Sequence, residues 1–422
     1  MGLSSRNVTY RVYPTKRQEG VLFHWLNLHR ELYNAALQER REAYRKCGVS
    51  IGYNAQQNVL PEIKVFRPDL IPLGSQALQE TLRRVDRGMK AFFRRIKAGE
   101  KPGYPRFRGS DRFDSFTYPG PAGWSISTEG KRPTVNIRNL GILKTRGKAR
   151  FAVNDLERRC LTVKKKADRW YTTVTYRGGK GVFAREPAPS GTATGMDVGC
   201  LSTAVLADGT KIENPKFYTK MLAKLAVLQK SISRKKKGSG KRKKAKAIIA
   251  RLHQKVACQR RDFHHQNAAR IVNAYSVIGY EGNLNVKGMT RSARGTVENP
   301  GRNVKQKSGL NRSILDASVS GFIGLVASKA EEAGGHGVAV DKDGSTVDCC
   351  YCGARNAMAL GDRVYRCRYC RLEIDRDRNS AINIMLRALE TLRCGTHRRG
   401  EGICSLYEAG HHNQIAQAIG YW

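Results

Sequence analysis

Two closely spaced pairs of cysteines form the most specific chemical pattern in the sequence. Each pair follows the pattern C-x2-C, and fourteen residues separate one pair from the other. Two such turns can surround one zinc ion with four thiolates at ~2.3 Å, and a site closed by four protein ligands is structural rather than catalytic. Four unrelated buried cysteines are the alternative. The predicted zinc ligands are Cys349, Cys352, Cys367 and Cys370, and the spacing of Cys350 makes it a bystander.

Acidic residues are scarce, so the few that stand near predicted strand ends are candidates for chemistry. Asp197 lies on the first strand of a predicted hairpin, Glu281 ends a predicted strand, and Asp375 and Asp377 precede a predicted helix. Carboxylates that converge from separate elements can bind Mg²⁺, and two such ions activate water in phosphodiester cleavage. The spacing leaves two alternatives open, with Glu281 as a surface turn residue and Asp377 as a helix cap.

The charge balance indicates what such a site would act on. Lysine and arginine number 77 against 35 aspartates and glutamates, which gives 77 − 35 = +42 and an isoelectric point near 10.2. This excess opposes compaction unless an anion neutralises it, and nucleic acid is the anion that we expect. A solvated basic surface and a membrane-surface protein are the alternatives.

Basic side chains concentrate on three segments. These are a helix predicted at 75–98, a Gly/Pro-rich loop at 99–108 and the lysine-rich run 234–246. In the loop, Tyr104 and Phe107 alternate with cations, and they would either stack on bases or pack a turn. A solvated helix face is the alternative for the basic runs. The candidate phosphate-binding residues are Arg83, Arg84, Arg87, Lys90, Arg106, Lys235 and Lys236.

The sequence shows no export or membrane signal. No apolar run approaches the ~20 residues of a membrane span, and the first ten residues lack the apolar core of a signal peptide. We therefore expect a cytoplasmic protein with no membrane partner. Eleven cysteines in that compartment favour metal ligands or reduced thiols over disulfides.

Hydrophobic periodicity predicts the elements that would position these residues. Helical spacing covers 21–47 and 75–98, short alternating stretches predict a β-rich region over 113–183, and 186–195 has the composition of a linker. The C-terminal half predicts a hairpin at 194–212, a helical stretch at 219–275 broken near 238–240, a strand at 275–283, and helices at 313–335 and 378–392.

Taken together, these motifs resemble those of TnpB, the transposon-encoded ancestor of compact type V CRISPR effector nucleases. The similarity covers nearly the whole chain and follows the family's order. Few families place a zinc ribbon just before the last acid of an RNase H-type triad, so the set is specific. The motifs are Tyr13-Pro14-Thr15 with Gln18, Tyr33-Asn34, Ala91-Phe92-Phe93, 103–107, the segments around Asp197 and Glu281, 311–318, the cysteine pairs and 375–384.

Two segments depart from the family's pattern. Gly282 and Asn283 follow Glu281, where the family often has E-D-L or E-N-L. The stretch 345–348 has the sequence S-T-V-D, where the family usually has T-S-Q, so a role of this stretch in gripping substrate is in doubt.

The resemblance implies an α+β multidomain protein. A wedge β-barrel at 1–20 and 110–190 would carry an inserted helical recognition lobe at 21–109. A RuvC-like nuclease domain of the RNase H type would occupy 191–344 and 373–392, with a zinc-ribbon insert for target nucleic acid at 345–372. The tail, 393–422, is expected to be flexible.

The resemblance also implies an RNA-guided DNA endonuclease. Guide RNA would pair with double-stranded target DNA beside a short recognised motif, and the RuvC site would cut displaced single strands. Asp197, Glu281 and Asp377 match the catalytic triad, which would hold Mg²⁺, two ions being expected. Asp377 is preferred over Asp375 because the family's aspartate stands two residues before an asparagine, here Asn379.

Two other functions remain open at this level. One is RNA-guided DNA binding without cleavage, and the other is RNA binding by a basic zinc-ribbon protein. The sequence separates neither a transposon TnpB from a CRISPR effector nor a monomer from a dimer.

Overall fold

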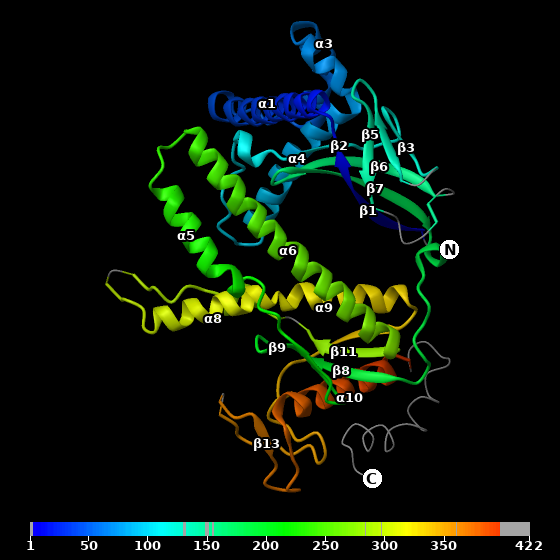
Figure 1. Cartoon of the computed structure of the whole chain (residues 1–422), viewed down its shortest axis with the longest axis vertical. Helices are drawn as coiled ribbons and strands as arrows, with labels where there is room; N and C mark the ends of the chain where they lie inside the picture. Colours follow the sequence, from blue (N-terminus) through cyan, green and yellow to red (C-terminus); the bar gives the residue numbers. More distant parts are fainter. Residues whose placement is uncertain are drawn as a thin grey trace. The chain divides into compact units, whose positions relative to one another are not determined.

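The computed structural model describes residues 3–129, 132–147, 152–153, 156–282, 284–296, 298–359 and 361–396 (Figure 1). The chain divides into two compact units, unit 1 at Met1–Phe183 and unit 2 at Ala184–Trp422. The predicted tail is largely outside the described residues, and its predicted flexibility remains a prediction.

Unit 1 is built on one curved antiparallel sheet (Figure 1). The N-terminal strand pairs with a strand that ends at Gly179, and along that partner Trp170, Thr172, Val174 and Tyr176 alternate into the core. The strand order is β2-β6-β7-β1-β5-β4-β3, so β2 and β3 are edges and the described hydrogen bonds do not close a barrel. The strands are β1 Leu3–Tyr13, β2 Ser115–Tyr118, β3 Trp124–Ser127, β4 Thr134–Ile137, β5 Gly141–Arg146, β6 Glu157–Lys166 and β7 Arg169–Gly179.

Helices between β1 and β2 cover this sheet. The first one starts earlier than position 21, where periodicity begins, because Thr15 and Gln18 form a capping box that starts the helix at Lys16. It ends at Gly48, whose left-handed backbone stops it. The helices are α1 Lys16–Cys47, α2 Tyr53–Asn58, α3 Leu60–Phe66 and α4 Ser75–Lys97, with short 3-10 turns η1 Pro68–Leu73, η2 Ser110–Arg112 and η3 Lys180–Phe183.

The packing of α1 on α4 contains a buried polar pair. The Nδ1 atom of His29 lies 2.7 Å from the Thr81 hydroxyl oxygen, and that hydroxyl donates to the carbonyl of Ala77. Because the hydroxyl proton is used, His29 is the donor of the pair and its Nδ1 carries the hydrogen. Burial, followed by the nearby charge of Arg84, lowers the pKa of His29 to about 3, so the ring stays neutral.

Unit 2 is built on a mixed five-stranded sheet with the order β10-β9-β8-β11-β12. The three strands β8, β11 and β12 run parallel, while β9 is antiparallel to both of its neighbours. The predicted hairpin at 194–212 and strand at 275–283 are confirmed. The strands are β8 Ala193–Asp197, β9 Ser202–Leu206, β10 Lys211–Glu213, β11 Val277–Glu281 and β12 His336–Val340.

Helices cover both faces of this sheet (Figure 1). Met196 of β8 and Ile278 of β11 pack with Phe322 and Ala268, which come from two helices on one face, while the last helix packs on the other. The long helical stretch is interrupted between Ser233 and Gly240, as the sequence predicts. The helices are η4 Thr219–Met221, α5 Leu222–Ser233, α6 Gly240–Ala274, α7 Val286–Met289, α8 Val304–Ala317, α9 Val319–Glu332 and α10 Arg376–Thr396.

The single helix predicted at 313–335 is wrong. Ser318 has a left-handed backbone with φ of 51°, which separates α8 from α9. The first of these helices also starts earlier than predicted, at Val304. Together the two helices span Val304–Glu332, the one described stretch whose length and hydropathy would suffice to cross a membrane. Phe322 and Val326 instead bury the apolar face of α9 in the core of unit 2, which accounts for that hydropathy.

Candidate functional site

Two strand glycines allow α10 to lie directly on the sheet. Gly195 in β8 and Gly279 in β11 each stand two residues before an acid. A Cβ atom at Gly195 would lie 1.9 Å from the carbonyl oxygen of Ala381, and one at Gly279 would lie 2.7 Å from that of Ile384. Because alternate strand residues share a face, α10 covers the face on which the two acids lie.

Three carboxylates meet at the carboxyl edge of this sheet. Asp197 ends β8 and Glu281 ends the adjacent parallel strand β11, while Asp377 lies in the first turn of α10. Burial raises the pKa of Asp197 to about 8, and the negative charges of Asp377 and Glu281 add to that effect. The three acids that the sequence singled out therefore interact in one site.

The acids fit a hard divalent cation by their chemistry. They offer carboxylate oxygens, the ligands that Mg²⁺ takes, and a cation would offset both the burial of Asp197 and the neighbouring negative charges that raise its pKa. Among the described residues, however, only the cysteine cluster gathers three or more metal-ligating atoms within 4.8 Å of one another.

Asp375 has a different role from Asp377. Its Oδ1 accepts hydrogen bonds from the backbone N–H groups of Asp377 at 3.0 Å and Arg378 at 3.1 Å, so Asp375 caps α10. Its Oδ2 lies 2.8 Å from the Lys211 ammonium. The alternative in which Asp377 caps the helix is thus wrong, since the cap is the acid two residues earlier.

Two residues near the acids were not among the predicted site residues. The Ser345 hydroxyl donates to Glu281 at 3.0 Å although 64 positions separate them. The Arg376 Nε lies 3.5 Å from the Asp377 carboxylate, and its charge lowers the pKa of Asp197 against the larger effects that raise it. Ser345 belongs to the stretch where the sequence departs from the family's T-S-Q, and this contact gives that stretch a place beside the acids.

Two buried asparagines of α10 join the acids to the cysteine segment. Asn379 donates to the carbonyl of Asp348 at 2.8 Å and accepts from the backbone N–H of Cys350 at 3.0 Å. Asn383 donates to the carbonyls of Ser345 at 3.0 Å and Asp348 at 2.7 Å. These bonds hold the first cysteine turn against the helix that carries Asp377.

The four predicted zinc ligands converge. Their sulfur atoms all lie within 4.8 Å of one another, and the pairs Cys349–Cys370 and Cys352–Cys367 are each 3.6 Å apart. A tetrahedron with bonds of ~2.3 Å has edges of about 3.8 Å, so the cluster has the size that zinc requires. Cys350 lies outside this group, as predicted, and is buried in the local core.

The two cysteine turns have the same backbone geometry. In the first, the N–H of Cys349 donates to Ala354 and the N–H of Gly353 donates back to Cys349. In the second, the same two bonds recur between Cys367 and Leu372 and between Arg371 and Cys367. A short hairpin, β13 Val364–Arg366 with β14 Glu373–Asp375, then leads into α10.

The candidate phosphate-binding residues fall into different surroundings. Arg84 is half-buried, donates to the Thr117 hydroxyl at 2.8 Å and ties α4 to β2, so its guanidinium serves the fold instead of facing solvent. Arg87 pairs with Glu80 and Lys90 pairs with Asp86, yet both side chains remain exposed.

The remaining four candidates also differ in exposure. Arg83 lies over the ring of Tyr53, Lys235 donates to Ser231 at the end of α5, and Arg106 and Lys236 are exposed. Whether they contact nucleic acid stays a prediction.

Comparison with known proteins identifies the family. An Escherichia coli protein named "Putative RNA-guided DNA endonuclease InsQ" is 31% identical over 389 residues, which cover 92% of this chain and 93% of that protein. The chain belongs to the TnpB family. A Streptomyces pristinaespiralis protein named "Putative RNA-guided DNA endonuclease" is 29% identical over 92% of this chain and 91% of its own length.

Family models match three parts of this TnpB-family chain. A model described as "Probable transposase", OrfB of IS605, matches 162–293, and the Cas12f1-like TNB domain matches 320–384, which includes the cysteine cluster. A "Helix-turn-helix domain" model of the same family matches 1–48, where the structure has the strand β1 followed by the single long helix α1.

A solved structure shares the overall fold of this TnpB-family protein. The Cas12f1 chain of a complex with single guide RNA and target DNA matches with a TM-score of 0.53 at 13% sequence identity, covering 91% of this chain and 99% of that chain. At this identity the likeness shows the fold, a mixed α+β multidomain architecture with a C-terminal cysteine cluster.

Proposed function

We propose that this protein is an RNA-guided DNA endonuclease that cuts with the three carboxylates of unit 2. Both long relatives bear that name, and they match more than nine-tenths of the chain. The observation that carries the proposal is the meeting of Asp197, Glu281 and Asp377 at one sheet edge, where burial raises the pKa of Asp197 and the charges of the other two acids raise it further. If the five strands of unit 2 are numbered by their order in the chain, their order across the sheet is 3-2-1-4-5, and strand 2 (β9) is antiparallel to its neighbours. This topology supports a RuvC-like domain of the RNase H type.

The three acids would hold Mg²⁺ through their oxygens. Magnesium bound there would activate water and stabilise the departing 3′-oxygen of a cleaved phosphodiester. The chain contributes positioning: Ser345 fixes Glu281, Arg376 supports the charge of Asp377, and Asp375 fixes the start of α10. Because Asp375 is engaged by Lys211 and two backbone N–H groups, it lies outside the proposed ligand set.

Zinc in the four-cysteine cluster would act as a structural ion. All four positions of a tetrahedral ion would be taken by thiolates, which leaves none for substrate. The asparagine bonds from α10 mean that this ion would also stabilise the helix carrying Asp377. We assign 345–372 to a zinc ribbon, unit 1 to a wedge domain with its helical lobe, and the rest of unit 2 to the nuclease domain.

Guide RNA and target DNA are the proposed partners. The excess of 42 positive charges supplies non-specific affinity for phosphates, and guide pairing would supply sequence specificity. The solved Cas12f1 relative contains single guide RNA and target DNA.

The test begins with the RNA that co-purifies with the protein from cells carrying its native locus. A discrete RNA that ends in a variable segment would be the guide, and plasmids that match the segment should be cut only with Mg²⁺. Asp197→Ala should abolish cleavage and keep RNA binding. Asp341→Asn is the matched control, because this acid follows the third parallel strand but its side chain is exposed to solvent. Cleavage by Asp197→Ala, or recovery of bulk cellular RNA alone, would refute the proposal.

A further inference from the structure

Three segments that are distant in the sequence meet on one surface of unit 1. Tyr33-Asn34 lies on α1, Ala91-Phe92-Phe93 lies near the end of α4, and 103–108 follows that helix. The Asn34 side chain binds both backbone groups of Arg108, donating to its carbonyl at 3.0 Å and accepting from its N–H at 2.8 Å. The Arg108 guanidinium also lies 5.9 Å from the centre of the Tyr33 ring.

Aromatic rings fix the other end of the loop. The rings of Phe92 and Tyr104 meet edge to face with centres 5.3 Å apart, and Phe93 meets Phe92 in the same way at 5.2 Å. Pro105 packs against α4 beside Gly88, where its Cγ lies 4.0 Å from the site of a Cβ. The loop is therefore held at both ends before any partner binds.

This packing leaves much of the aromatic surface in water. Phe93 is 52% exposed, Phe107 46% and Tyr104 38%. A loop that served only to complete the core would bury these rings, since burial of an aromatic side chain is strongly favourable. The exposed rings are consequently available to a partner.

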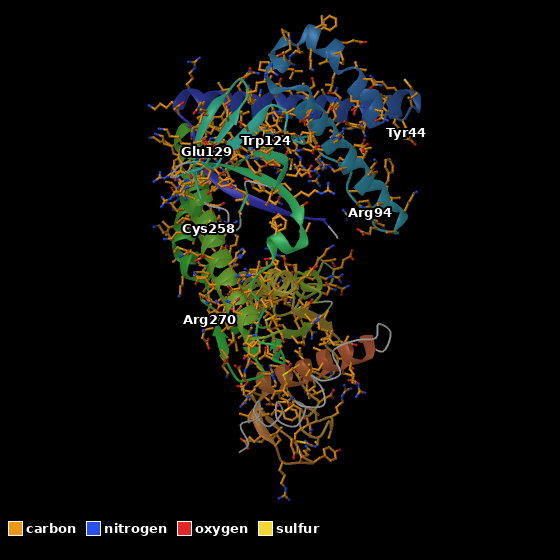
Figure 2. All side chains as sticks on the ribbon, turned by 90° about the vertical axis from the view of Figure 1, so that its right-hand side faces the viewer. Tyr44, Arg94, Trp124, Glu129, Cys258 and Arg270 are labelled. Atoms are coloured by element: carbon orange, nitrogen blue, oxygen red, sulfur yellow. The ribbon has the colours of Figure 1, made fainter. Side chains whose placement is uncertain are left out.

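Cations surround these rings. Arg94, Lys97, Lys101 and Arg106 are exposed, and none forms an ion pair within the part of the chain that the structure describes. Figure 2 labels Arg94 close to the end of α4. Glu100, the acid that lies among them in the sequence, is already bound by Arg95 at 2.6 Å. An apolar protein partner would have to strip water from these cations without compensation, whereas phosphates would neutralise them.

We propose that this surface, the aromatic platform of Phe93, Tyr104 and Phe107 with its rim of cations, stacks unpaired bases of the guide RNA. The inference rests on the proposed function, and it names the surface of unit 1 that binds the guide RNA. Rings would stack on bases while the cations contact the flanking phosphates, a combination that tolerates different base sequences. Structured RNA displays unpaired bases in loops and junctions, whereas target DNA is a duplex that exposes a single strand only after the guide has paired with it. RNA is therefore the occupant that meets the exposed rings first.

The test compares two double variants with a matched control. Phe93→Ala with Phe107→Ala removes stacking surface, and Arg94→Gln with Arg106→Gln removes charge. Phe66→Ala is the control, because Phe66 is 83% exposed on α3 and lies outside the platform. Each full-length protein is stripped of RNA, checked by thermal melting, and titrated with the co-purifying guide RNA at several salt concentrations. Photocrosslinking to the guide and to target DNA then locates the bound strand.

The two variants should differ in a defined way. Loss of stacking should weaken guide binding about tenfold per stacked base with an unchanged slope against salt. Loss of the two arginines should lower that slope by about 0.7 per phosphate contact. Wild-type affinity in the Phe93/Phe107 variant, or crosslinks from the platform to target DNA instead of guide, would overturn the inference and leave the nuclease proposal standing. Absence of any discrete guide from wild-type protein would overturn both.

Discussion

The contact between Gly195 and α10 yields the sharpest prediction. In Gly195→Ala the new Cβ would lie 1.9 Å from the Ala381 carbonyl oxygen, whereas Cβ contacts below 3.0 Å are essentially never seen. The helix must therefore move by at least about 1.1 Å (3.0 − 1.9) or the strand must move equally. Because α10 carries Asp377, this shift displaces one of the three carboxylates relative to the other two.

The expected effect is a loss of cleavage larger than the loss of stability. Misplacement of a reacting group by about 1 Å can cost on the order of 10²-fold in rate, and overpacking typically costs about 1–3 kcal/mol. Single-turnover cleavage of a guide-matched plasmid at saturating Mg²⁺ measures the first, and denaturant unfolding measures the second. Guide RNA binding should be unchanged.

Two glycine variants provide the comparison. Gly279→Ala should have a weaker effect, since its Cβ would lie 2.7 Å from the Ile384 oxygen and needs only about 0.3 Å (3.0 − 2.7) to clear it. Gly324→Ala in α9 is the control, because a Cβ there meets nothing within 4 Å. Wild-type cleavage by Gly195→Ala would refute the reasoning that this glycine sets the position of Asp377.

Three further perturbations test other parts of the structure. Ser345→Ala removes the hydrogen bond to Glu281. Loss of a residue that positions a metal ligand typically costs about 10–100-fold in metal affinity or activity, so cleavage should fall about tenfold and should need more Mg²⁺. An unchanged Mg²⁺ titration would contradict this. Removal of zinc with a chelator, or Cys352→Ser, should open 345–372 to proteases and reduce cleavage, because Asn379 ties this segment to α10; cleavage that survives complete zinc loss would contradict the coupling. Below pH 6.5 the unfolded state protonates His29, whereas the folded state does not until about pH 3. The free energy of unfolding should therefore fall by up to about 1.4 kcal/mol for each pH unit of acidification over that window. Denaturant titrations at pH 7 and pH 5.5 should show a smaller fall of this free energy in His29→Gln than in the wild-type protein.

Local spacing determined the parts of this protein that need only neighbouring residues. The two C-x2-C turns each place two sulfurs by their own backbone geometry, so the cluster of Cys349, Cys352, Cys367 and Cys370 was predictable. The long helices α1, α4 and α6 were predictable because an apolar stripe every three to four residues is a property of one segment. The three acids were found through their place in family motifs, since spacing alone left each of them ambiguous.

The tertiary structure decided the relations between distant segments. The partners of individual side chains depend on what the fold places opposite them. Examples are the cap of α10 by Asp375 instead of Asp377, the bond from Ser345 to Glu281, and the bond from Arg84 to Thr117. The meeting of Asn34 with Arg108 has the same origin. Local sequence patterns set periodicity and turn chemistry. The contacts of Ser345, Arg84 and Asn34 join residues tens of positions apart, and only the packed fold brings such partners within a hydrogen bond of each other.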